Sequence, residues 1–152
     1  EILESSGSDN HVNKHVLIVD DSTIARKQIQ KVVQSLGMST TVKKDGKQAL
    51  DYLESLIAEG KDPEQELLMI ISDIEMPEMD GYTFTAEVRD NQHLCKLHIV
   101  LHTSLSGVFN EAMVKKVGAN DFLAKFHPDE LAKRVNARVE QVCNENQGEI
   151  LK

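Results

Sequence analysis

Five polar residues, each at the end of a short apolar run or just after it, carry the chemical possibilities of this chain. They are Asp20, Asp21, Asp73, Thr103 and Lys125. Carboxylate oxygens are the ligands that Mg²⁺ takes in proteins, usually one or two of them together with a phosphate. A carboxylate can also attack phosphorus and form an aspartyl phosphate. These residues are spread along the sequence, so they can act together only if the fold gathers them.

The combination of three carboxylates, a hydroxyl and an ammonium group suits phosphoryl transfer. Packed carboxylates raise one another's pKa values, and a divalent cation removes that repulsion. Asp20 and Asp21 would hold the cation with one oxygen of Asp73, whose other oxygen would be the nucleophile. Phosphoryl transfer needs positioning and charge neutralisation more than covalent chemistry. Lys125 would add a mobile positive charge, and the Thr103 hydroxyl could donate to a phosphoryl oxygen.

The elements that would position these residues follow from the apolar pattern. Apolar runs predict strands at 15–19, 38–42, 67–71, 97–101 and 121–124. Helical spacing predicts helices over about 25–36, 45–57, 82–90, 107–118 and 128–143. Residues 60–66 are expected to form a polar loop. Five strands alternating with five helices predict an α/β fold with a parallel sheet, in which ligands bind beyond the carboxyl ends of the strands.

Composition narrows the functional classes. The chain has 152 residues, about one domain, and a net charge of −8 with 4% aromatic residues. A clustered basic face and aromatic stacking platforms, which nucleic-acid binding requires, are not evident. No apolar run is long enough for membrane insertion, and no signal peptide is visible. Cys95 and Cys143 have no metal-ligand spacing, so unpaired thiols and a cytoplasmic location are expected.

Four motifs resemble those of response-regulator receiver domains of two-component signalling. They are Val19-Asp20-Asp21-Ser22, the stretch 72–81 with its Asp-x-x-Met-Pro-x-Met-Asp-Gly pattern, Thr103-Ser104, and Phe122-Leu123-Ala124-Lys125. The resemblance covers roughly residues 14–142. It implies a flavodoxin-like (βα)5 doubly wound sheet of five parallel strands in the order 2-1-3-4-5. The receiver domain would span 15–143, between a linker or tail at 1–14 and a C-terminal tail at 144–152.

The resemblance also implies roles for the site residues. Asp73 would accept a phosphoryl group from a histidine kinase, and the domain would lose it again by hydrolysis without being a dedicated enzyme. Asp20, Asp21, Asp73 and the backbone carbonyl of Glu75 would hold Mg²⁺ or Mn²⁺. Thr103 and Lys125 would sense the phosphoryl group. Movement of Thr103 would make space for Phe122 and reshape the surface of 107–118, 120–124 and 128–143.

Two segments resemble the receiver of CheV-type chemotaxis coupling proteins: 102–107 and 121–126. In that family a CheW-like coupling domain precedes the receiver, so the implied partner is the chemoreceptor–kinase complex. Two positions depart from the usual receiver pattern. Phe126 follows the lysine where most receivers have proline, which puts the special turn there in doubt. Phe122 stands where tyrosine is frequent, so its movement would rest on apolar packing.

Three alternatives remain open from the sequence. The domain could be a phosphate sink for a shared kinase, or a pseudo-receiver that binds partners without phosphorylation. A phosphatase of the aspartyl-phosphate type is a third, but it needs a second aspartate where Glu75 stands. Glu75 and Leu105 are expected to control water access to the phosphoryl group. His98 and His102 share a strand face, and a metal site built on them is disfavoured.

Overall fold

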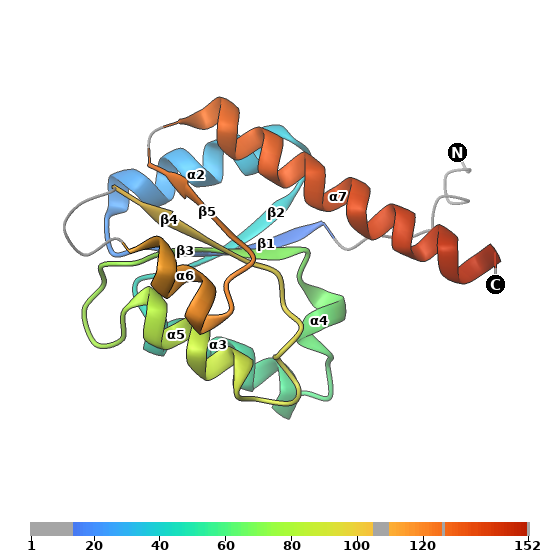
Figure 1. The fold of residues 1–152 in the computed structure, drawn as a ribbon, viewed down its shortest axis with the longest axis horizontal. Helices are drawn as coiled ribbons and strands as arrows, with labels where there is room; N and C mark the ends of the chain where they lie inside the picture. The colour runs from blue at the N-terminus through green and yellow to red at the C-terminus, as the bar shows by residue number, and fades with distance from the viewer. Residues whose placement is uncertain (1–13, 105–109, 126, 152) are drawn as a thin grey trace.

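The computed structural model describes residues 14–104, 110–125 and 127–151. Within them, five strands form one parallel sheet in the order β2-β1-β3-β4-β5 (Figure 1). The strands are β1 His15–Val19, β2 Ser39–Lys43, β3 Met69–Asp73, β4 Ile99–Thr103 and β5 Asp121–Ala124. The flavodoxin-like order expected from the resemblance is confirmed.

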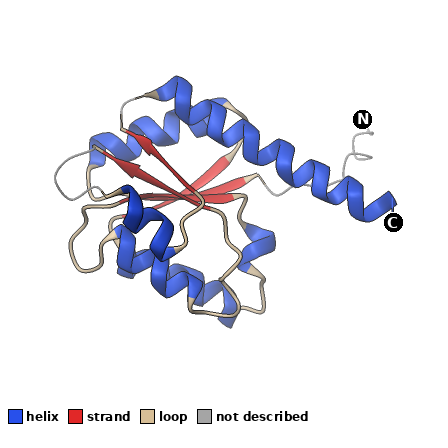
Figure 2. Ribbon diagram, in the orientation of Figure 1, coloured by secondary structure: helices blue, strands red, loops and turns tan. Residues whose placement is uncertain are grey.

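Helices cover both faces of the sheet (Figure 2). They are α2 Thr23–Ser35, α3 Gly46–Ala58, α4 Pro63–Glu66, α5 Gly81–Arg89, α6 Glu111–Val117 and α7 Pro128–Leu151. Helices α2 and α7 lie on one face, and α3, α5 and α6 lie on the other. None of the described helices combines the length and apolar character that crossing a membrane requires.

Two apolar cores fill the space between the sheet and these helix layers. Val16, Ile18 and Ile71 belong to the core under α2 and α7, whereas Leu17 and Leu101 belong to the opposite core. Successive residues of a strand point to opposite faces, so the central strands must be apolar at nearly every position. This explains why every residue of β3 and β4 is buried.

Two helices differ from those predicted from the apolar spacing of the sequence. The predicted loop at 60–66 contains α4, because the Asp62 side chain accepts a hydrogen bond from the Glu64 N–H and Pro63 suits a first helical position. Helix α7 runs beyond the predicted end at 143, so residues 144–151, expected as a tail, are helical. Apolar spacing marks only the part of a helix that packs on a core, so it does not fix where the helix ends.

Some expectations concern segments outside the described residues. These are residues 1–13 of the linker expected at 1–14, the start of the helix predicted from 107, the loop residue Leu105, and the turn at Phe126. Helix α6 begins at Glu111 after an Asn110 cap, whose side chain accepts from the backbone N–H of Ala112.

Arg89 at the end of α5 joins the segments that precede β4 and β5. Its Nε donates to the Gly118 carbonyl at 2.7 Å, and Nη1 donates to the carbonyls of Cys95 and Leu97 at 3.0 and 2.7 Å. Its Nη2 donates to Asn120 Oδ1 at 2.8 Å. One planar group therefore satisfies four acceptors, which a lysine cannot reproduce.

We expect Arg89→Lys to lower the free energy of unfolding by about 2–4 kcal/mol, because several acceptors lose their donor. Urea denaturation measures the change. Arg134→Lys is the matched control, since Arg134 is 37% exposed in its ion pair with Asp121 and should lose less than about 1 kcal/mol. Equal losses in the two variants would contradict the role given to Arg89.

Candidate functional site

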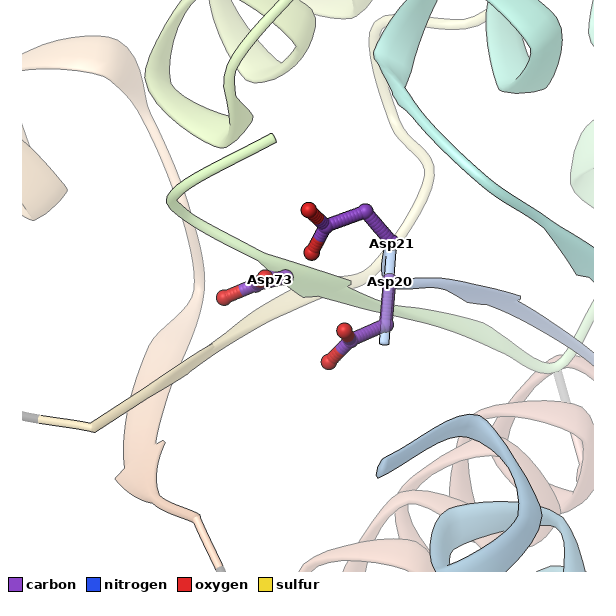
Figure 3. Close-up of side chains that lie close together, drawn as sticks. All are labelled: Asp20, Asp21 and Asp73. Carbon is purple, nitrogen blue, oxygen red and sulfur yellow. The ribbon is translucent and has the colours of Figure 1, made fainter. Parts of the chain in front are cut away.

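Three aspartates gather at the carboxyl ends of β1 and β3 (Figure 3). Asp20 and Asp21 follow β1, and Asp73 is the last residue of β3. One carboxylate oxygen from each lies within 4.8 Å of the others. Asp20 and Asp73 are buried, at 0% and 4% exposure, whereas Asp21 is exposed. The sequence prediction that the fold brings these carboxylates together is confirmed in its geometry.

The turn after β1 fixes Asp20 through both backbone and side chain. The Asp20 N–H donates to the Lys43 carbonyl at 3.0 Å, which extends the sheet pairing by one residue. Asp20 Oδ1 accepts from the Ser22 N–H at 2.8 Å, and the Arg26 guanidinium donates to the Asp20 carbonyl at 2.8 Å. Ser22 also caps α2 by accepting from the Ala25 N–H. The start of α2 and the position of Asp20 are therefore set together.

The segment after β3 folds back tightly against Asp73. Asp73 Oδ1 accepts from the Ile74 N–H at 2.8 Å, and the Ser72 hydroxyl donates to the Asp73 carbonyl at 2.9 Å. The Gly81 N–H donates to the Ile74 carbonyl at 2.8 Å. A Cβ at Gly81 would overlap the Asp73 carbonyl oxygen, so this position requires glycine. The Asp-to-Gly motif is thus a closed loop that holds Asp73 at the edge of the sheet.

Lys125, the residue after β5, adds a positive charge to the cluster. Its backbone N–H donates to the Thr103 carbonyl at 2.8 Å, which ties the end of β5 to the end of β4. Its Nζ lies 3.1 Å from Asp73 Oδ1 and 3.3 Å from Asp20 Oδ2, with the side chain 12% exposed. One ammonium group therefore bridges the two buried carboxylates.

The electrostatics of the cluster shift the pKa values of the two buried aspartates in opposite directions. Burial, together with the nearby charge of Asp20, raises the pKa of Asp73 to about 6 against the opposing charge of Lys125. Burial also raises the pKa of Asp20, but His102, the Ser22 N–H and Lys125 outweigh it and hold that pKa below its usual value. Burial lowers the pKa of Lys125, whereas Asp20 and Asp73 raise it more, so Lys125 stays charged.

The remaining predicted residues lie around this cluster. Thr103 ends β4 and is 2% exposed. Phe122 on β5 is partly buried against the core under α3, α5 and α6. Glu75 is exposed and lines, together with Asp21, a hollow of about 740 Å³ beside the carboxylates. Thr103 and Glu75 thus lie at the edge of the sheet that carries the aspartates, whereas Phe122 lies further back along β5, level with Leu101.

The donor set fits a hard divalent cation. Among the described residues this is the one group of three or more His, Cys, Asp or Glu side chains that could bind a metal. Asp20 Oδ2 is buried, and the Lys125 ammonium at 3.3 Å is the positive charge beside it. Oxygen-only ligands suit Mg²⁺ or Mn²⁺, and the hollow beside Asp21 leaves room for the waters that Mg²⁺ retains.

One neighbour of the cluster was not assigned a role from the sequence. His102 Nδ1 lies 3.8 Å from Asp20 Oδ2, and its ring is buried. The only sequence signal is a histidine within an otherwise apolar strand, one residue before Thr103. Strand alternation alone could not show that this ring faces Asp20.

Comparison with known proteins agrees with the fold and the acidic cluster. Residues 16–136 match the family described as the response regulator receiver domain. The chemotaxis protein CheV3 of Helicobacter pylori is 33% identical over 122 residues, which cover 80% of this chain. The aligned part is 39% of CheV3, so the chain spans well under half of that relative.

Two solved structures share the architecture. The signal receiver domain of a signal transduction histidine kinase from Syntrophus aciditrophicus has a TM-score of 0.72 and 28% identity, covering 85% of this chain and 92% of that one. The receiver domain of the sensor histidine kinase PA1611 from Pseudomonas aeruginosa has a TM-score of 0.70 and 26% identity, covering 85% and 99%. The latter structure has a magnesium ion coordinated in its active-site cleft.

The raised pKa of Asp73 makes its charge a cost to folding. The folded state holds a proton that the unfolded state releases, so stability falls as pH rises from about 4 to about 6. We therefore expect Asp73→Asn to raise the free energy of unfolding of the metal-free protein at pH 7.5 by about 1–3 kcal/mol. The gain should shrink to about half at pH 5.

Urea denaturation in EDTA at both pH values measures this difference. Asp51→Asn is the matched control, because Asp51 is 63% exposed and only 3.9 Å from Lys47 in a surface pair. It should change stability by less than about 0.5 kcal/mol. A gain for Asp73→Asn that grows as pH falls would show that the sign is wrong.

Proposed function

The chain belongs to the response regulator receiver domain family, and on that premise we propose that Asp73 accepts a phosphoryl group from a histidine kinase. The observation that carries the proposal is the bridge from Lys125 to both buried carboxylates, at 3.1 and 3.3 Å. Such an arrangement stabilises negative charge at the place where a phosphoryl group would arrive. The receiver domain is not a classical enzyme, and the chain itself is the substrate.

The chemistry assigned to Asp73 is a displacement at phosphorus. A carboxylate oxygen forms the new P–O bond while the P–N bond of the kinase phosphohistidine breaks, and the leaving imidazole nitrogen keeps the electron pair and is protonated by solvent. Lys125 and the Ile74 N–H both contact Oδ1 of Asp73, so we assign Oδ2 as the attacking atom. Lys125 then holds charge on the transferring group.

We assign the cation site to Asp20, Asp21, Asp73 and the backbone carbonyl of Glu75. When bound, Mg²⁺ or Mn²⁺ would supply the charge neutralisation that three carboxylates and an incoming phosphoryl group require. The magnesium ion in the PA1611 receiver supports this assignment.

The residues of the proposed switch lie on the face of the sheet that α3, α5 and α6 cover, opposite the face that carries Asp20 and Asp73. Leu101 belongs to the core under α3, α5 and α6, and Thr103, two residues on, shares its face. Phe122 pairs with Leu101 in register and packs against the same core. A pull of Thr103 toward the phosphoryl group would thus act on the core that holds Phe122. The output surface would comprise α6, β5 and α7.

The size of the switch follows from the interactions available. Complete switching from about 1:99 to 99:1 needs roughly 5.5 kcal/mol, whereas one charge-assisted hydrogen bond supplies about 1.5–3 kcal/mol. Thr103 alone therefore gives partial switching unless Lys125 and the cation contribute as well.

The similarity to CheV3 supports a chemotaxis role. We propose that the domain works in the cytoplasm, follows a CheW-like coupling domain, and modulates its contact with a chemoreceptor–kinase complex. A role as phosphate sink for a shared kinase is the second candidate, and the same acceptor site supports it. A pseudo-receiver is disfavoured because the acidic cluster and Lys125 are all present.

Intact-protein mass spectrometry after incubation with acetyl phosphate tests the acceptor assignment. We expect a single phosphoryl adduct on the wild-type chain in the presence of Mg²⁺ and none in EDTA. Asp73→Asn should carry no adduct, whereas Asp51→Asn, which changes an exposed carboxylate, should be labelled like the wild type. Absence of any adduct, under conditions that label another receiver, would favour the pseudo-receiver.

Partial switching has its own measurement. When a phosphoryl mimic is added with Mg²⁺ to the Lys125→Ala variant, the NMR signals of the Phe122 ring should shift only part of the way from their inactive to their active positions. The wild-type chain should move further, because Lys125 adds to the bond from Thr103. Full switching in the variant would contradict a shared contribution.

A further inference from the structure

His102 lies in the same row of side chains as the acidic cluster. Strand register pairs it with Asp73 on one side and with Leu123 on the other. Paired residues of a parallel sheet point to the same face, and Leu123 belongs to the core under α2 and α7. His102 therefore shares a face with Asp73, next to Asp20, and is 3% exposed.

The imidazole separates Asp20 from a groove between α2 and α7. Its Nδ1 lies 3.8 Å from Asp20 Oδ2. The ring also lines a groove of about 430 Å³, together with Ile29, Leu123 and Leu131. The side chain thus has an acidic group on one side and a largely apolar surface on the other.

Asp20 Oδ2 and His102 Nδ1 are both buried and face each other without forming a hydrogen bond. Asp20 Oδ2 has the Lys125 ammonium 3.3 Å away, whereas His102 Nδ1 has no hydrogen-bond partner in the described part of the chain. Asp20 Oδ1 accepts from the Ser22 N–H, so the groups beside Oδ2 determine how the carboxylate is rotated. The gap of 3.8 Å exceeds hydrogen-bond range by less than about 1 Å, and closing it would give Nδ1 an acceptor and Oδ2 a second donor.

We propose that His102 is a positioning residue that orients Asp20 for the divalent cation through an Nδ1–H···Oδ2 hydrogen bond. This inference rests on the proposed function, because it concerns the same cation site. Hydrogen-bond partners of a metal-ligating carboxylate fix its orientation, and their loss typically weakens metal binding about 10–100-fold. The role requires a proton on Nδ1.

Calorimetric titration with Mg²⁺ tests the role by comparing variants of this one residue. Asn places an amide nitrogen near the Nδ1 position, Gln places one near the Nε2 position, and Leu removes the donor while filling the space. We expect His102→Asn to bind Mg²⁺ within about threefold of the wild type, and His102→Gln and His102→Leu to bind about tenfold more weakly. His98→Asn, which changes the histidine next to the start of β4, should leave the affinity unchanged.

The outcomes separate this inference from the proposed function. Wild-type affinity in His102→Leu, with normal binding by the wild-type chain, would overturn the role of His102 and leave the acceptor site standing. Failure of the wild-type chain to bind Mg²⁺, or equal binding by Asp21→Asn, would overturn the cation site and this inference with it. If His102→Leu folds poorly in EDTA, the Asn and Gln variants decide, and equal affinities would overturn the inference.

Nitrogen NMR of the imidazole gives a readout that needs no cation. In the neutral ring of the metal-free protein we expect the proton on Nδ1, because the hydrogen bond selects the tautomer. A neutral ring with its proton on Nε2 would overturn the inference, since Nδ1 could not then donate to Asp20.

Discussion

Lys125 Nζ, 3.1 Å from Asp73 and 3.3 Å from Asp20, is the contact on which the other features of this site depend. Two buried carboxylates side by side repel each other, and burial penalises both charges. A single ammonium group offsets part of this cost but leaves a net negative cluster once Asp21 is included. The cluster therefore keeps an excess of negative charge. That imbalance is what suits it to a divalent cation and a phosphoryl group.

The fold supplies this cluster through the geometry of a parallel sheet. All five strands end at the same edge, so residues that follow them meet there whatever their separation in sequence. The acidic residues and the proposed switch residues lie on different faces of the sheet. Asp20, Asp73 and His102 continue the face under α2 and α7, whereas Thr103 and Phe122 continue the face under α3, α5 and α6. In the proposed mechanism the phosphoryl site therefore lies between the carboxylates of one face and the switch residues of the other.

Much of this arrangement was predictable because it depends on short-range patterns. The apolar runs before Asp20 and Asp73 identified buried strands, and the rule for strand ends then placed the carboxylates together. The strand order came from the resemblance to receiver domains. Features that depend on particular side-chain directions were not predictable. No sequence pattern singles out Arg89, yet its guanidinium donates to the carbonyls of two later segments.

His102 illustrates the same limit at the site itself. The sequence places His102 in an apolar strand, and only the structure shows that its ring lies beside Asp20. The length of α7 was missed for a related reason, since residues 144–151 do not show the apolar spacing from which the helix was predicted. Elements with a repeated apolar spacing can thus be predicted from the sequence, whereas single contacts between distant segments cannot.

Chemical trapping of the phosphorylated chain tests the central assignment most directly. Borohydride reduces an acyl phosphate to an alcohol and so converts a phosphorylated aspartate to homoserine, which peptide mass spectrometry can locate. We expect conversion of Asp73 alone, and only in samples that were phosphorylated with Mg²⁺ present. Conversion of Asp20 or Asp21 instead, or an unmodified Asp73 in a chain that has gained a phosphoryl group, would contradict it.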